Sequence, residues 1–245
     1  MYENILKDIV IKTKVTKDII ETRIQHPITQ QKYPKRTFFV LLKKYANDFL
    51  SSGSEPRMIG LAGLRGTGKT TLMWQLAEDL YTNYKNYRNS IYFFNLNEIT
   101  TLNFSLFETL ETFQKEVLKQ RFNQLKSPII MLFDEIHDDK DWAKTLKVLY
   151  DEAKTAFIVC TGSSALLLQQ TADLSRRIRV EKIYPLRFIE FITTKSFFQS
   201  SDKNILYPEK NLTSQLKNAL FYYHSANDVY NTVKRIEPII QNYYE

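Results

Sequence analysis

Short runs of wholly apolar residues alternate with longer stretches of helical periodicity through the middle of this chain. The helical stretches, in which apolar residues recur every three or four positions, predict helices over 70–84, 104–125 and 142–153. The apolar runs predict buried strands over 58–62, 91–94, 129–133 and 156–160, with a weaker fifth strand over 178–184. Because strands that are apolar on both faces are typical of helix-covered parallel sheets, the pattern predicts an α/β fold with a parallel sheet of about five strands.

The regions on either side of this alternating core are expected to be helical. Residues 1–52 are predicted to form a helical N-terminal arm that ends with a helix over 36–51. The core itself occupies residues 53–198. Residues 199–245 are predicted to form a short helical C-terminal segment, with two helices over 211–242.

The composition excludes several classes of protein. A single cysteine, Cys160, rules out an intrachain disulfide and a cysteine-based metal cluster, and the three histidines make no zinc motif. No signal peptide is evident, and no apolar run approaches the roughly 18–20 residues that span a bilayer, so we expect a cytoplasmic protein without a membrane partner. The net charge of +7 is spread along the chain. Two interpretations of this charge stay open: binding of nucleic acid, and a lysine-rich surface that is merely solvated.

The glycines point to a nucleotide site. Four of the six glycines fall between positions 60 and 68, and residues 63–70 complete the pattern G-x-x-x-x-G-K-[ST] of a phosphate-binding loop, or Walker A motif. Glycines let successive backbone N–H groups face phosphate oxygens, and the helix that follows adds its positive end. Lys69 is expected to reach the β- and γ-phosphates and Thr70 to bind Mg²⁺. The predicted nucleotide-binding residues are Gly63, Leu64, Arg65, Gly66, Thr67, Gly68, Lys69, Thr70 and Thr71.

Two adjacent carboxylates follow the third apolar strand. Five apolar residues before Asp134 match a Walker B pattern, in which this aspartate would hold Mg²⁺ directly or through water. Glu135 would orient the water that attacks the γ-phosphate and accept its proton. The alternative interpretation is that the pair caps the next helix.

The end of the fourth strand carries hydroxyl side chains. A hydroxyl from Thr161 or Ser163 would lie beside the γ-phosphate and the attacking water and act as a polar sensor. The alternative is an ordinary turn with Ser163 as the N-cap of the next helix, and both interpretations can hold together.

Arg177 lies in a cluster of arginines over residues 175–179. An arginine can stabilise phosphate charge in its own subunit or in a neighbouring one, because its guanidinium is planar and permanently charged. Contact with nucleic acid and surface ion pairs are the alternatives that stay open for Arg177.

A full strand and helix separate the phosphate loop from Asp134. This spacing predicts a strand inserted between the phosphate-loop strand and the strand that ends at Asp134, which is the layout of the P-loop ATPases with an additional strand and a catalytic glutamate. It argues against a small GTPase, as does the lack of an N-K-x-D motif.

Together these motifs resemble the prokaryotic AAA-type P-loop ATPases that often carry a C-terminal restriction-nuclease-like domain. The resemblance extends over residues 56–195 and rests on GLRGTGKTTL, LFDEIHDDKDWAKTLKVLYDE, IVCTGSSALLL and RRIRVEKIYPLRFIEF. Arg177 matches the family arginine, whereas Arg176 replaces the usual glycine. The nuclease-like domain is expected to be absent here, because only about 45 residues follow position 200.

The sequence therefore predicts Mg²⁺-dependent ATP binding and hydrolysis, coupled to a conformational or assembly change. Homo-oligomerisation and binding of a protein partner both stay open, because the sequence reveals neither the oligomeric state nor the partner. Two alternatives stay open: a nucleotide-gated switch or scaffold that hydrolyses slowly or not at all, and a DNA-associated ATPase of mobile-element or defence biology.

Overall fold

The computed structural model describes residues 2–163 and 172–187, together with residues 190, 230 and 234. The chain divides into two compact units, Met1–Pro185 and Leu186–Glu245. The helices predicted over 211–242 lie almost entirely outside the described residues. Within the described part of the chain, no helix combines the length and the apolar character needed to cross a bilayer.

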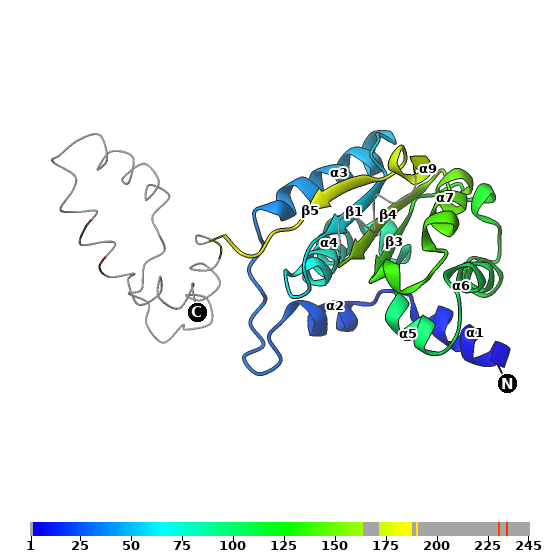
Figure 1. Cartoon of the computed structure of the whole chain (residues 1–245), viewed down its shortest axis with the longest axis horizontal. Helices are drawn as coiled ribbons and strands as arrows, with labels where there is room; N and C mark the ends of the chain where they lie inside the picture. The colour runs from blue at the N-terminus through cyan, green and yellow to red at the C-terminus, as the bar shows by residue number, and fades with distance from the viewer. Residues whose placement is uncertain (1, 164–171, 188–189, 191–229, 231–233, 235–245) are drawn as a thin grey trace. The chain divides into compact units, whose positions relative to one another are not determined.

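A five-stranded parallel sheet forms the centre of the first unit, in the order β2-β3-β4-β1-β5 (Figure 1). The predicted α/β fold with a parallel sheet of about five strands is confirmed. A strand does lie between the phosphate-loop strand β1 and the Asp134 strand β3, but it is β4, which follows both motifs in sequence. The strand from the segment between the motifs, β2, lies instead at the sheet edge beyond β3. The strands are β1 (Met58–Ala62), β2 (Ile91–Asn95), β3 (Ile129–Asp134), β4 (Ala156–Gly162) and β5 (Arg179–Lys182).

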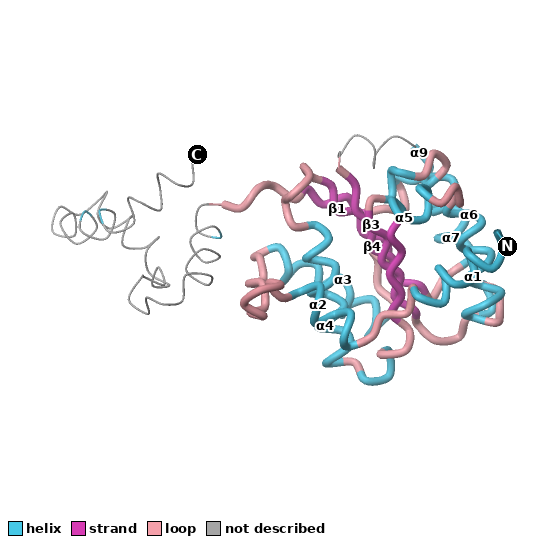
Figure 2. Tube along the Cα trace, turned by 90° about the horizontal axis from the view of Figure 1, so that it is seen from below, coloured by secondary structure: helices cyan, strands magenta, loops and turns pink. Residues whose placement is uncertain are grey.

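Helices cover both faces of this sheet, and alternate residues of each strand pack against opposite layers (Figure 2). Ile59 and Leu61 of β1 pack with α2 (Lys17–Ile24), α3 (Phe38–Ser52) and α4 (Lys69–Asn83). Met58 and Ala62 belong to the other layer, with α1 (Tyr2–Lys12), α5 (Leu96–Thr101), α6 (Leu106–Phe113) and α7 (Trp142–Glu152). The shorter elements are η1 (Lys85–Tyr87), η2 (Gln114–Leu118), η3 (Phe122–Gln124), η4 (Ile136–Asp138) and α9 (Ala172–Ser175).

The link between α1 and α2 pairs with the outer edge of β2. Lys14 forms an antiparallel bridge with Tyr92. Two backbone hydrogen bonds flank it, from Val15 N–H to the Ile91 carbonyl at 2.9 Å and from Phe93 N–H to the Thr13 carbonyl at 2.8 Å. The N-terminal residues thus supply backbone partners to a strand that would otherwise have an open edge.

The prediction of one helix over 104–125 is wrong in its second half. α6 begins at a capping box, in which Ser105 and Glu108 satisfy each other's backbone N–H groups, but it gives way to the π-helical turn η2. Lys119 then takes a left-handed conformation with φ 56°. This reversal lets Phe122 pack against Phe113 with 6.4 Å between ring centroids, so burial of an aromatic ring ends the helix.

Candidate functional site

The phosphate loop connects β1 to α4 at the carboxyl edge of the sheet. Gly66 and Gly68 have φ angles of +82° and +83°, a conformation that residues with a Cβ rarely adopt. Thr67 closes the turn, because its hydroxyl donates to the Leu64 carbonyl at 2.9 Å. The loop thereby delivers the chain into the first turn of α4, whose N–H groups lack partners within the helix and suit an anion.

Gly63 is needed for a different reason, which is close packing. A Cβ built on Gly63 would lie 2.2 Å from the carbonyl oxygen of Ile183, in the segment that leaves β5. Because the neighbouring atom belongs to the backbone, rotating a side chain cannot relieve the clash. The start of the loop and the segment after β5 therefore pack together only if residue 63 has no side chain.

We expect Gly63→Ala to lower the free energy of unfolding by about 1–3 kcal/mol, since overpacking forces backbone shifts. The midpoint of urea denaturation measures the change. Leu64→Ala is the matched control, because the Leu64 side chain next to it is 67% exposed. Equal midpoints for Gly63→Ala and the wild type would contradict the close packing.

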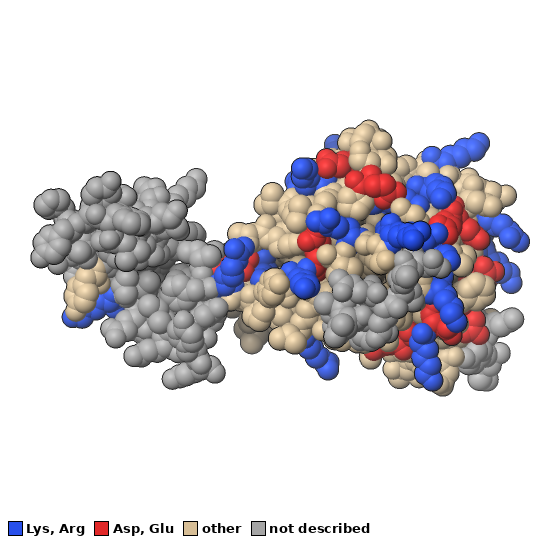
Figure 3. All heavy atoms as spheres, turned by 45° about the horizontal axis from the view of Figure 1, so that its top comes forward, with Lys and Arg blue, Asp and Glu red and all other residues tan. Residues whose placement is uncertain are grey.

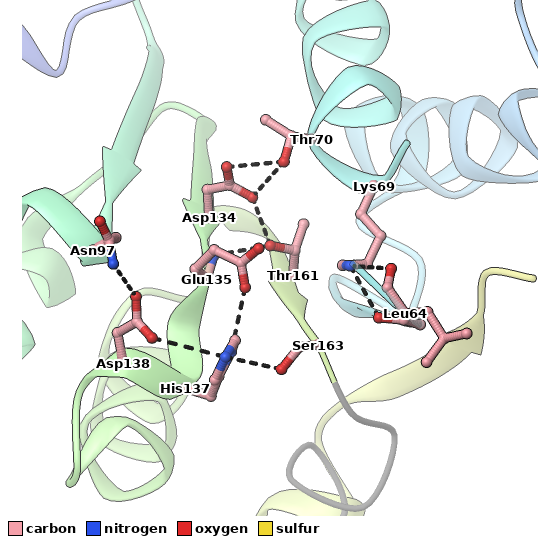
Figure 4. A network of polar contacts seen from close by, with 11 residues as sticks. Leu64, Lys69, Thr70, Asn97, Asp134, Glu135, His137, Asp138, Thr161 and Ser163 are labelled. Atoms are coloured by element: carbon pink, nitrogen blue, oxygen red, sulfur yellow. Dashed lines mark hydrogen bonds and ion pairs between the residues drawn. The ribbon is translucent and has the colours of Figure 1, made fainter. Parts of the chain in front are cut away.

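Lys69 is buried, and its ammonium lies within the curve of the loop (Figure 4). Nζ donates to the carbonyls of Gly63 and Leu64, each at 2.9 Å. An ammonium has three donors, so one N–H is left without a partner among the described residues. That remaining donor and the positive charge suit a phosphate oxygen.

The Asp134 carboxylate joins the phosphate loop to β4. Both of its oxygens lie 2.9 Å from Thr70 Oγ1, and Oδ1 also accepts a hydrogen bond of 2.6 Å from Thr161 Oγ1 (Figure 4). The residues fit Mg²⁺, which prefers hard oxygen ligands and is commonly held by one or two protein groups together with phosphates and waters. No cluster of three or more His, Cys, Asp or Glu side chains suited to a metal occurs in the described ranges.

Glu135 takes a left-handed backbone conformation, with φ 52° and ψ 49°. Its N–H donates to Thr161 Oγ1 at 2.9 Å, which fixes the turn immediately after β3. Non-glycine residues in this conformation are uncommon and concentrate at functional sites. The side chain makes no capping hydrogen bond to η4, so the interpretation of the Asp134–Glu135 pair as a helix cap does not agree with the structure.

A second polar cluster extends from Glu135 along η4. His137 Nε2 lies 2.9 Å from Ser163 Oγ, and His137 Nδ1 lies 3.5 Å from Glu135 Oε2. Asn97 donates to Asp138 at 3.0 Å (Figure 4). The sequence interpretation missed these partners, although a histidine two positions after the glutamate was a visible signal. Whether Ser163 also caps a helix concerns residues 164–171, which lie outside the described part.

Arg177 is not brought to this cluster. It lies two residues before β5, and therefore beyond the amino edge of a parallel sheet whose carboxyl edge carries the phosphate loop. Its guanidinium pairs with Asp151 of α7 through two hydrogen bonds, Nε to Oδ1 at 3.0 Å and Nη2 to Oδ2 at 3.1 Å. These bonds lower the pKa of Asp151. A role for Arg177 at a nucleotide of a neighbouring subunit stays a prediction.

Residues 55–192 match a family model described as an AAA domain. Two relatives are uncharacterized proteins of Methanocaldococcus jannaschii. MJ1637 is 35% identical over 161 residues, which cover 66% of this chain and 33% of that protein. MJ1544 is 31% identical over 137 residues, which cover 55% of this chain and 28% of that protein. The chain thus spans about a third or less of the length of these curated relatives.

Solved structures share the fold at low sequence identity. The Aeropyrum pernix ORC1 protein, in a complex with DNA, has a TM-score of 0.55 and 13% identity, over 89% of this chain and 64% of that one. The Aeropyrum pernix ORC2 protein, in ADPNP–ADP complexes, has a TM-score of 0.52 and 12% identity, over 80% and 59% of the two chains. At this identity the likeness concerns the fold alone.

Proposed function

The chain belongs to the AAA domain family, and from that premise we propose that it binds ATP with Mg²⁺ and hydrolyses it. The membership confirms the family predicted from the motifs. The observation that carries the proposal is the Asp134 carboxylate, which accepts hydrogen bonds from Thr70 of the phosphate loop and Thr161 of β4. A loop that binds phosphate, an acid that suits a metal and a strand-end hydroxyl thereby meet at one edge of the sheet.

Binding would rest on the loop and the start of α4. The Gly63 N–H donates to the Gly162 carbonyl at 3.3 Å and the Thr67 N–H to the Leu64 carbonyl at 3.4 Å, so other backbone N–H groups of the loop and of the first turn of α4 would face the phosphates. The free N–H of Lys69 would reach the β- and γ-phosphate oxygens. Thr70 and Asp134 would hold Mg²⁺, directly or through water. When bound, Mg²⁺ supplies charge neutralisation on the phosphate oxygens, so the protein has mainly to position the reacting groups.

Hydrolysis would rest on Glu135, which would orient the attacking water and accept its proton. Thr161 and Ser163 would sense the γ-phosphate from the end of β4. The Thr161 hydroxyl would connect the metal-binding residue with the catalytic one, since it donates to Asp134 and accepts from the Glu135 N–H.

The nucleotide cycle would drive a change of conformation or of assembly with a protein partner, including a second copy of the chain. The one face of the molecule that Figure 3 draws gives the DNA-associated alternative no particular support. On the face drawn in Figure 3, lysine and arginine side chains are interspersed with aspartate and glutamate. A mixed surface of this kind does not form the basic stripe that tracks a nucleic-acid backbone.

Lys69→Ala tests nucleotide binding. We expect it to weaken the affinity for a fluorescent ATP analogue roughly 10- to 150-fold, because hydrogen bonds to charged groups contribute about 1.5–3 kcal/mol each. Fluorescence titration in the presence of Mg²⁺ measures the dissociation constant. Lys44→Ala, at an exposed lysine of α3, is the control and should bind as the wild type does. Equal affinities for Lys69→Ala and Lys44→Ala would refute the proposed phosphate site.

A further inference from the structure

One arginine connects the phosphate loop to the end of the first unit. Arg36 precedes α3 and is half-buried. Its Nη1 donates to the carbonyl of Thr67, inside the phosphate loop, at 2.7 Å. Its Nη2 donates to the carbonyl of Tyr184 at 3.0 Å and to that of Pro185 at 3.4 Å. A single guanidinium thus binds backbone at positions more than a hundred residues apart.

The two ends of this bridge differ in character. Thr67 stands just before Gly68 and Lys69, where nucleotide phosphates would bind. Tyr184 and Pro185 follow β5, and Pro185 is the last residue of the first compact unit before the chain continues into Leu186. The bridge therefore joins the nucleotide site to the segment through which the chain leaves this unit.

A second contact holds the same two segments together. Ile183 N–H donates to the Ala62 carbonyl at 2.7 Å, at the end of β1. The Ile183 carbonyl oxygen occupies the space beside Gly63, where a Cβ would approach it to 2.2 Å. The backbone contacts of Ile183 and the hydrogen bonds of Arg36 thus hold the exit segment Ile183–Pro185 next to the loop.

One peptide group of the loop lies between Arg36 and the side of the loop that would face a phosphate. The carbonyl that Arg36 binds belongs to the peptide group between Thr67 and Gly68. In a trans peptide the C=O and N–H point in opposite directions, so holding the Thr67 carbonyl fixes the direction of the Gly68 N–H. A phosphate that accepts a hydrogen bond from this N–H would polarise the peptide group and pull it away from Arg36, which is bonded to its carbonyl. Because the guanidinium is planar and presents its donors in a fixed fork, it transmits that displacement to Tyr184 and Pro185.

We propose that Arg36 is a positioning residue that couples phosphate binding in the loop to the exit segment Ile183–Pro185, and so to the chain that follows it. This inference rests on the proposed nucleotide binding. It assigns Arg36 a role in transmitting phosphate binding to the exit segment, in addition to its contribution to the stability of the folded structure.

Hydrogen exchange of the full chain tests the coupling. Exchange at the backbone amides of residues 183–187, all but Pro185, which has none, is compared with and without a non-hydrolysable ATP analogue and Mg²⁺. The analogue concentrations are those that saturate each variant in a fluorescence titration. In the wild type we expect the analogue to slow exchange there by about tenfold. In Arg36→Ala the difference between the two states should disappear. Arg36→Lys, which keeps the charge but offers one compact donor group, should retain only part of it.

Lys35→Ala is the matched control, since Lys35 is the neighbouring cation and pairs with Glu78 at 3.7 Å. It should respond as the wild type does. A purely structural Arg36 would speed exchange in both states of the variants and leave the analogue-dependent difference intact. That result in either Arg36 variant, or a wild type that binds the analogue without slower exchange at 183–187, would overturn the coupling alone. A wild type that does not bind the analogue would refute the proposed function itself.

Discussion

Replacing Glu135 with glutamine is expected to lower the steady-state rate of ATP hydrolysis by about 10²- to 10⁴-fold, which is the usual contribution of a positioned general base. Glutamine keeps the size of the side chain but cannot accept the proton of the attacking water. ATP affinity should change little, because the variant retains the backbone bond from residue 135 to Thr161 and the bonds from Thr70 and Thr161 to Asp134.

Phosphate release at saturating ATP measures this rate, and fluorescence titration measures the affinity. Glu152→Gln, at an exposed glutamate that ends α7, is the control for the loss of one negative charge. If wild type and Glu135→Gln both release phosphate at the background rate, the ATPase proposal fails, and the nucleotide-gated switch becomes the better description. Wild-type turnover in Glu135→Gln would instead show that another group activates the water.

Phe133→Ala is expected to lower the free energy of unfolding by about 3–5 kcal/mol, because removing a buried aromatic side chain loses its transfer energy and leaves a cavity. Phe133 is fully buried in the central part of the sheet and stacks on Phe94 of β2 with 4.9 Å between ring centroids. Since a domain is stable by only about 5–15 kcal/mol, this single change would remove much of the total.

The midpoint of urea denaturation, followed by circular dichroism, measures the loss. Phe107→Ala is the matched control, because the Phe107 ring on α6 is 54% exposed. ATP affinity should fall in Phe133→Ala as well, since the next residue along the strand is Asp134. Similar midpoints for the two phenylalanine variants would contradict the assignment of Phe133 to the core.

The strands were predictable because burial on both faces leaves a local signature. The predicted strand over 58–62 agrees with β1 residue for residue, and the strand ending at Phe133 agrees with β3 to within one residue. The meeting of Thr70, Asp134 and Thr161 was predictable for a related reason. Parallel strands place their carboxyl ends at one edge of the sheet, so residues that follow different strands converge there.

Features that depend on backbone pairing or on distant partners were not predictable. The contacts of Thr13 and Val15 with β2 use N–H and C=O groups, which every residue carries. The end of the helix after Phe113 depends on Phe122, and the helical spacing of apolar residues gave no sign of the turn between them. The pairing of Arg177 with Asp151 joins side chains 26 positions apart, and many acidic residues could have served equally well.

The backbone pairing along β2 also bears on how copies of this chain can associate. An uncovered edge strand is a template for another chain, and such strand addition leads to swapped dimers and amyloid-like stacking. Residues 13–15 occupy that template on the β2 side. On the opposite side, the sequence Arg-Val-Glu-Lys of β5 places charges along the sheet edge, which discourages strand addition. An ordered assembly is therefore expected to form through contacts between side chains, without backbone hydrogen bonds that join the sheets of neighbouring copies.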